Sequence, residues 1–256
     1  MNREVLMLTW NIRCRTTGLG TIAEVVAGTG ADVVVLTEYR PRQRGGISLS
    51  DELSERGFSY QQASTQTTAN TDVRGVLLAS RIPLEPLESA APNVYPERWV
   101  AAVLEDTGLL VGGIYLPGRK TGAKQRWWTW LLAQAGTWQD RPAVLLGDFN
   151  TGLHRIDELG ATLSCTDSMQ ALLSSGWTDA WRSLHPNERS YSWWSRVGNG
   201  FRLDHAFVSE RVRVERAEFV TSVADTKLVR TPDDEDEGKG ISDHAALLTA
   251  CTVIGS

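Results

Sequence analysis

The sequence predicts one α/β domain that spans residues 1–256. Short apolar runs that suit buried strands alternate with amphipathic segments that suit helices, and this interleaving is typical of α/β folds. No repeat or low-complexity linker divides the chain, and a hydrophobic content of 41% is enough to form a core. One compact unit is therefore favoured over two domains.

Eight short apolar runs predict the strands. Several place Val, Ile or Leu on consecutive positions, as residues 33–37 do, and this pattern indicates strands that are buried on both faces. The eight runs are residues 5–10, 33–37, 73–79, 99–104, 109–115, 143–146, 203–208 and 245–253.

Four segments between these runs predict helices. The longest spans residues 124–137, where Trp127, Trp128 and Leu131 recur at helical spacing and form one apolar face. The longest irregular stretch, residues 224–241, contains the acid run 233–237 and is expected to be a solvated loop. The other predicted helices are residues 21–27, 48–56 and 167–175.

Composition limits the classes of function. The chain carries 26 Lys and Arg against 31 Asp and Glu, a formal charge of −5, which argues against a polyanionic partner because phosphate binding favours basic surfaces. No apolar run reaches the roughly 18 residues of a membrane helix, and the first residues do not form a secretory signal, so we expect no membrane partner. Cys14, Cys165 and Cys251 are too few and too scattered for a disulfide framework, which favours a reducing cytoplasm.

Polar residues lie at the ends of several predicted strands. A buried carboxylate is costly unless it is paired or binds a metal. One such residue is more often a turn former or a cap, and the Asp-Phe-Asn sequence that ends at Asn150 is by itself typical of an Asx-turn. Five such sites in one chain are harder to explain in this way, and their oxygen atoms suit Mg²⁺ better than zinc. The five sites are Asn11, Glu38, Asp148 with Asn150, Asp204, and Asp243 with His244.

These residues belong to an ordered set of motifs that spans nearly the whole chain. The motifs are Trp10-Asn-Ile12, Leu36-Thr-Glu38, Gly147-Asp-Phe-Asn150, Arg202-Leu-Asp204 and Ser242-Asp-His244. In this order the set resembles the endonuclease/exonuclease/phosphatase superfamily. The resemblance implies a four-layer α/β/β/α sandwich, in which two packed mixed β-sheets carry helices on their outer faces.

Two further stretches resemble the exonuclease III-like abasic-site endonucleases within this superfamily. Gly113-Ile-Tyr-Leu-Pro117 resembles their Tyr-x-Pro strand end, and the tryptophan-rich stretch from Gly176 to Asp204 is similar to them as well. The resemblance implies a DNA repair enzyme that depends on Mg²⁺, with Mn²⁺ as the alternative ion. Such an enzyme would act as a monomer on duplex DNA, cleaving 5′ to abasic sites and processing 3′-blocked ends as a 3′-phosphodiesterase or a 3′→5′ exonuclease.

The same resemblance implies a role for each polar residue. Glu38 would be the main Mg²⁺ ligand, with Asp243 and Asn11 nearby. Asp148 would activate the attacking water, and Asn150 would hold that water in place. Phosphodiester cleavage needs both a positioned water and a metal on a phosphate oxygen, and this part of the set would supply them.

The remaining roles concern developing charge. His244, paired with Asp204, would stabilise charge on the scissile phosphate, and Tyr115 would donate to a phosphate oxygen or to the leaving group. Arg13 departs from the family pattern, which usually has Asp or Asn at this position. The positive charge of Arg13 favours one metal ion over two, or a phosphate contact by Arg13 itself.

Seven residues are expected to contact DNA. Phe201 would help to line a pocket for the base-less sugar, although aromatic residues at such positions more often belong to a core or a sheet pair. Basic residues prevail in residues 117–134 and 182–202, and these two strips are expected to flank the site. The expected contacts are Arg74, Arg98, Arg119, Lys120, Trp194, Phe201 and Arg202.

Two alternative functions stay open at this point. One is a hydrolase of the same fold that acts on RNA or on a small phosphate ester, which the Tyr-x-Pro and Trp-Trp stretches disfavour. The other is a catalytically inactive nucleic-acid-binding protein. The complete polar set disfavours this second alternative, because folding alone does not demand those residues.

Overall fold

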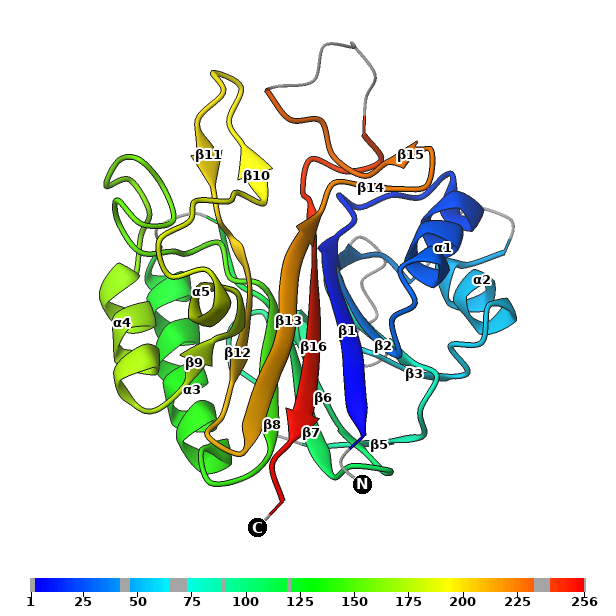
Figure 1. Ribbon diagram of the computed structural model, residues 1–256, viewed down its shortest axis with the longest axis horizontal. Coiled ribbons are helices and arrows are strands. Elements are labelled where there is room, and N and C mark those ends of the chain that lie inside the picture. The colour runs from blue at the N-terminus through cyan, green and yellow to red at the C-terminus, as the bar shows by residue number, and fades with distance from the viewer. Residues whose placement is uncertain are drawn as a thin grey trace.

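The computed structural model describes residues 3–41, 47–64, 73–88, 91–118, 121–232 and 240–255. In these ranges two six-stranded β-sheets pack face to face, and helices cover their outer faces (Figure 1). The predicted four-layer α/β/β/α sandwich is therefore confirmed.

The first sheet is mixed, because one of its strand pairs is parallel. It consists of β1 (Glu4–Asn11), β2 (Val33–Tyr39), β3 (Tyr60–Ala63), β4 (Gly75–Ser80), β13 (Val212–Val220) and β16 (Ala246–Val253). The strand order is β13-β16-β1-β2-β4-β3, with β1 and β2 parallel and the other neighbours antiparallel.

The second sheet is mixed in the same way. It consists of β5 (Leu84–Pro86), β6 (Trp99–Leu104), β7 (Leu109–Tyr115), β8 (Ala143–Asp148), β9 (Thr178–Asp179) and β12 (Asp204–Val208). The order is β5-β6-β7-β8-β12-β9, and only β7 and β8 are parallel. Two short hairpins, β10 (Trp193–Trp194) with β11 (Gly200–Phe201) and β14 (Ser222–Val223) with β15 (Thr226–Lys227), lie at one end of the sandwich (Figure 1).

Helices form the two outer layers. The first sheet is covered by α1 (Leu19–Gly28) and α2 (Leu49–Glu55), and the second by α3 (Gly122–Trp138) and α4 (Thr166–Ser174). The short helices are α5 (Ala180–Leu184) and the 3-10 helix η2 (Pro96–Arg98). No helix in the described ranges combines the length and the apolar character needed to cross a membrane. All three cysteines are free.

Strand β1 shows how the sequence builds these layers. Val5 and Met7 lie in the apolar cluster between the two sheets, whereas Leu8 and Trp10 lie in the cluster beneath α1 and α2. Successive side chains of a strand point to opposite faces, so an apolar run of this kind can fill two cores at once. The interpretation that such runs are buried on both faces is confirmed.

The eight predicted strands and four predicted helices are all present, and their ends differ from the prediction by at most two residues. The prediction missed β13, because this edge strand carries charged residues on its exposed face. It also missed α5 and the shorter strands. Residues 224–241 are not irregular throughout, because β15 falls within them and Leu228 is buried. The acid run 233–237 lies outside the described residues.

The position before Asp148 has no room for a side chain, and Gly147 occupies it. Its φ angle is +150°, and a Cβ atom at this position would lie 1.9 Å from the carbonyl oxygen of Ile114 in the neighbouring strand β7. Only glycine therefore allows β8 to run this close to β7 at the residue before Asp148, which ends β8.

Gly147→Ala is expected to lower the free energy of unfolding by about 2–4 kcal/mol, because the new methyl group displaces the β7 backbone and strains β8. Urea denaturation measures the change. Gly136→Ala is the matched control: Gly136 is helical with open space around it, so alanine there should stabilise the protein by up to about 1 kcal/mol. A Gly147→Ala protein as stable as the wild type would contradict the steric argument.

Candidate active site

All the predicted polar residues except Asp204 line one cavity of about 600 Å³, to which the β10–β11 hairpin contributes Trp193 and Phe201. Asn11 ends β1, Glu38 lies near the end of β2, and Asp148 ends β8. Tyr115 is the register partner of Asp148, and Asp148 is in turn the register partner of Asp204. Strand pairing therefore places these groups side by side.

Asp204 and His244 form a buried ion pair. The Nδ1 atom of His244 lies 2.7 Å from Oδ2 of Asp204, and neither side chain is more than 8% exposed. Burial alone would lower the pKa of His244, but the charge and hydrogen bond of Asp204 raise it to about 9. The Nδ1 atom is engaged with Asp204, so the charged imidazole offers its other nitrogen to the cavity. The predicted pairing is confirmed.

Asp148 is a buried carboxylate with three hydrogen bonds. Asn11 Nδ2 and Asn150 Nδ2 donate to Oδ2 at 2.9 and 3.0 Å, and the Asn150 backbone N–H donates to Oδ1 at 2.9 Å. Burial and the nearby charge of Asp204 raise the pKa of Asp148 to about 7, against the opposing effect of His244. A carboxyl group whose pKa lies near neutrality can accept a proton from water and release it again.

Glu38 sits where β2 departs from regular geometry. Its φ angle is +56°, and the β2–β4 register shifts between Thr37 and Tyr39. The Tyr115 hydroxyl donates to Oε1 at 2.9 Å, and the Cys14 thiol donates to Oε2 at 2.8 Å. Burial and this carboxylate raise the pKa of Cys14 to about 12 and raise that of Tyr115 as well. Both groups therefore stay protonated donors.

The residues present fit a divalent cation. Glu38 and Asp243 line the cavity with side chains that are 15% and 43% exposed. Each carboxylate oxygen has a second lone pair, so the hydrogen bonds that Glu38 accepts leave it able to bind an ion. Asp148, Asp204 and His244 also each offer an atom within 4.8 Å of one another, but Asp204 and His244 are already bonded together. A set of carboxylate oxygens is the environment that hard cations prefer.

One wall of the cavity is apolar and aromatic. Phe201 lines it as expected, together with Trp193 and Leu203, which were not among the expected contacts. Trp194 instead lines a smaller neighbouring cavity. The strand alternation of β10 explains the difference, because Trp193 and Trp194 must point to opposite faces. The doublet was visible in the sequence, but its register was not.

Two of the expected phosphate contacts lie at the cavity and two lie outside the described residues. Arg74 and Arg98 line the cavity, and the Arg98 guanidinium lies 4.4 Å from the ring centre of Tyr115 and 4.6 Å from that of Tyr95. These cation–π contacts hold Arg98 at the rim. Arg119 and Lys120 lie outside the described residues.

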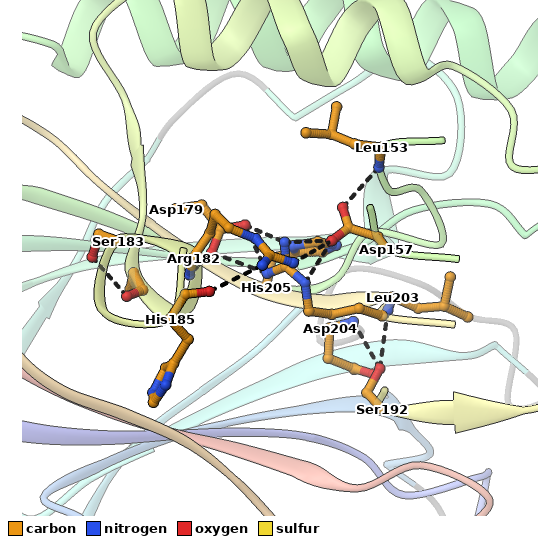
Figure 2. A network of polar contacts seen from close by, with 12 residues as sticks. Leu153, Asp157, Asp179, Arg182, Ser183, His185, Ser192, Leu203, Asp204 and His205 are labelled. Carbon is orange, nitrogen blue, oxygen red and sulfur yellow. Dashed lines mark hydrogen bonds and ion pairs between the residues drawn. The ribbon is translucent and has the colours of Figure 1, made fainter. Parts of the chain in front are cut away.

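The prediction that Arg202 contacts DNA is wrong, because its side chain is 1% exposed. It lies 2.7 Å from oxygens of Asp157 and of Asp179, and Asp179 also accepts a bond from buried His205. Figure 2 shows Asp157, Asp179 and His205 gathered in one network, with Asp204 beside it. Arg202 therefore ties the start of β12 to Asp157 and Asp179, and so positions Asp204.

Lys124 is a second basic residue that proves to be internal. Its side chain is fully buried, and Nζ donates to the carbonyl oxygen of Asn150 at 2.6 Å and to Ser164 Oγ at 3.0 Å. Burial lowers the pKa of Lys124 to about 8. Lys124 therefore does not contribute to the basic surface that was expected for residues 117–134. No feature of the sequence distinguishes this lysine from the exposed ones.

Comparison with known proteins agrees with this geometry. A model of the Endonuclease/Exonuclease/phosphatase family matches residues 8–244, so the chain belongs to this family. Recombination repair protein 1 of Drosophila melanogaster is 33% identical over 87 residues, which cover 28% of this chain and only 13% of that protein.

Solved structures similar to this chain include two DNA-processing enzymes. A 3′ phosphatase from Neisseria bound to a product DNA hairpin has a TM-score of 0.76 and 22% identity, with 96% of this chain and 98% of that one covered. An AP endonuclease from Archaeoglobus fulgidus has a TM-score of 0.71 and 20% identity over the same shares of the two chains. At this identity the likeness shows the shared fold.

Arg202→Met is expected to lower the free energy of unfolding by about 3–5 kcal/mol, because Asp157 and Asp179 are left buried without a cation. Urea denaturation at neutral pH tests this. Arg213→Met serves as the control, since Arg213 forms an exposed pair with Glu215 that is worth about 1 kcal/mol or less. Equal small losses in both variants would show that the buried network contributes little.

Asp204→Asn is expected to lower the pKa of His244 from about 9 to below about 8, because burial then acts without the paired charge. NMR titration of the imidazole in EDTA-treated protein measures it, with exposed His154 as internal reference. The raised pKa means that the pair stabilises the fold fully below pH 6.5 and loses this effect as pH rises through about 9. An unchanged pKa in the variant would contradict the assignment.

Proposed function

We propose that the protein is a Mg²⁺-dependent DNA repair phosphodiesterase that cleaves duplex DNA 5′ to abasic sites and acts on 3′-blocked ends. One observation carries the proposal: a proton acceptor, a charged imidazole and an aromatic wall converge on one cavity. The wall of Trp193, Phe201 and Leu203 suits a sugar without a base, which leaves no polar base edge to satisfy. We propose further that the protein acts as a monomer in the cytoplasm.

The proposed reaction begins with water held by Asp148 and Asn150. Asp148 accepts a proton as the water oxygen attacks phosphorus, and the bond from phosphorus to the 3′ oxygen of the preceding nucleotide breaks. His244, kept charged by Asp204, stabilises the added negative charge on the phosphate. The Tyr115 hydroxyl donates a hydrogen bond to a phosphate oxygen or to the leaving 3′ oxygen. The leaving oxygen takes a proton from solvent water and ends as a hydroxyl group, and Asp148 returns its proton to solvent.

A divalent cation held by Glu38 and Asp243 would supply Lewis-acid stabilisation of the phosphate. Arg13 lies 3.8 Å from Asp243, and its positive charge supports the use of one ion rather than two. Asn11 serves a different task from the expected one: its amide donates to Asp148, and its oxygen accepts the Arg13 backbone N–H at 2.9 Å. We therefore assign Asn11 to orienting Asp148.

Removal of a 3′ phosphate from DNA is the second candidate activity. It is favoured by the likeness to the Neisseria 3′ phosphatase, whose fold this chain shares over nearly its whole length. The same groups would serve this reaction, since attack on a terminal phosphate also needs a positioned water and a stabilised leaving oxygen.

A duplex with one abasic-site analogue should be nicked in Mg²⁺ and left intact in EDTA. Asp148→Asn and His244→Ala should each lower the rate by at least about a hundredfold, because proton transfer or charge stabilisation is lost. Asp140→Asn, at an exposed position, is the control. Gel analysis of end-labelled strands measures the rate.

The other outcomes separate the alternatives. Release of phosphate from a 3′-phosphorylated hairpin without nicking would favour the 3′ phosphatase. Hydrolysis of RNA or of a small phosphate ester, with DNA left intact, would favour a different substrate. DNA binding without turnover of any ester would indicate an inactive binding protein.

A further inference from the structure

A second cavity of about 220 Å³ lies beside the active-site cavity. Asp243 lines both cavities and therefore forms part of the wall between them. This wall is fixed on two sides, because the Trp193 indole donates to Asp243 Oδ2 at 3.3 Å and the Arg13 guanidinium lies 3.8 Å from Oδ1. The side cavity thus adjoins the active-site cavity, and Asp148, Asn150 and His244 do not line it.

Two guanidinium groups line the side cavity. Arg13 is 61% exposed, and Arg230 is exposed and has no ion pair with any residue of the described ranges. Arg13 has a left-handed backbone with φ of +52°, a conformation that costs free energy and is often retained at functional positions. Asn11, which orients Asp148, accepts the Arg13 N–H and so holds the arginine in this conformation.

Trp194 adds an aromatic side chain to these charges. The hairpin strand β10 places Trp193 in the active-site cavity and Trp194 in the side cavity. Trp194 is partly exposed. Arginines beside a partly exposed aromatic ring can recognise a phosphate joined to a base, because the base stacks while the guanidinium binds the anion. The volume of 220 Å³ is below the roughly 300–1,000 Å³ of pockets that enclose a whole ligand. The cavity therefore suits one unit of a polymer better than a free ligand.

We propose that the side cavity binds the nucleotide next to the scissile phosphodiester on the cleaved strand. Arg13 and Arg230 contact its phosphate, and the base of that nucleotide stacks on Trp194. This inference rests on the proposed action on DNA, and it adds a binding subsite that sets how much strand must flank the cleavage point. Base stacking is tolerant of sequence, so the subsite requires a nucleotide without selecting one.

A binding cycle in an Asp148→Asn background tests the proposal without relying on turnover. Fluorescence anisotropy gives the Kd for hairpin duplexes shortened one nucleotide at a time on either side of the abasic analogue. On the full duplex, Arg230→Ala and Trp194→Ala should each weaken binding about fivefold to thirtyfold. Arg230→Ala should also reduce the slope of log Kd against log salt by about one. Arg211→Ala, an exposed arginine at the start of β13 and so at the opposite end of the sandwich, is the matched control.

The decisive result is that the two substitutions stop weakening binding at one particular truncation step. Once the proposed nucleotide has been removed, Arg230→Ala and Trp194→Ala should bind within about twofold of the parent. Constant ratios across all truncations would overturn the subsite, as would equal effects of Arg211→Ala. Displacement of the full duplex by a free deoxynucleoside monophosphate, lost in Trp194→Ala, would also overturn it in favour of a free-nucleotide site. Failure of the proposed function is seen separately, as absence of incision by the wild-type protein.

Discussion

The contact between Asp204 and His244 depends on how the two sheets pack. Asp204 begins β12 in the second sheet, whereas His244 precedes β16 in the first. Two further bonds cross in the same way: Asn11 of β1 donates to Asp148 of β8, and Tyr115 of β7 donates to Glu38 of β2. No sheet alone contains a working set. The site exists only when the apolar faces of the sheets are packed together, so stability and catalysis rest on the same interface.

Burying these charges requires support from behind the site. Arg202 pairs with Asp157 and Asp179 two residues before Asp204, where β12 begins. Burial alone would raise the pKa of Asp179, but Arg202 and His205 hold it well below its ordinary value. Lys124 similarly ties down the carbonyl group of Asn150, whose left-handed φ of +47° keeps its amide on Asp148. Buried residues that hold the catalytic side chains in place, such as Arg202 and Lys124, fix the geometry of the site. Their own charges must be removed from water, which costs free energy.

The sequence predicts the strands and the polar residues at their ends, because both follow from local pattern. A Val-rich run that ends at Glu38, or a glycine that precedes Asp148, is informative without knowledge of the fold. The long-range pairings are different in kind. Arg202 and the exposed arginines have the same chemistry, and only the positions of Asp157 and Asp179, distant in sequence, bury one and not the others. Likewise, the faces of Trp193 and Trp194 depend on the register of a two-residue strand, which local pattern does not specify.

The net charge of −5 can be understood in these terms. Coulombic attraction to a polyanion is felt over roughly 8–10 Å at physiological salt, so the charges near the two cavities decide binding. Arg74 and Arg98 line the active-site cavity, and Arg13 and Arg230 line the side cavity. The opposing carboxylates are engaged with His244, with hydrogen-bond donors or with the cation that Glu38 and Asp243 would hold. Arg202 and Lys124 count as basic residues but are buried, so they add no positive charge to the surface. The net charge of the whole chain is therefore a poor guide to the charge that DNA would meet. A protein of acidic composition can therefore present a locally cationic path to DNA.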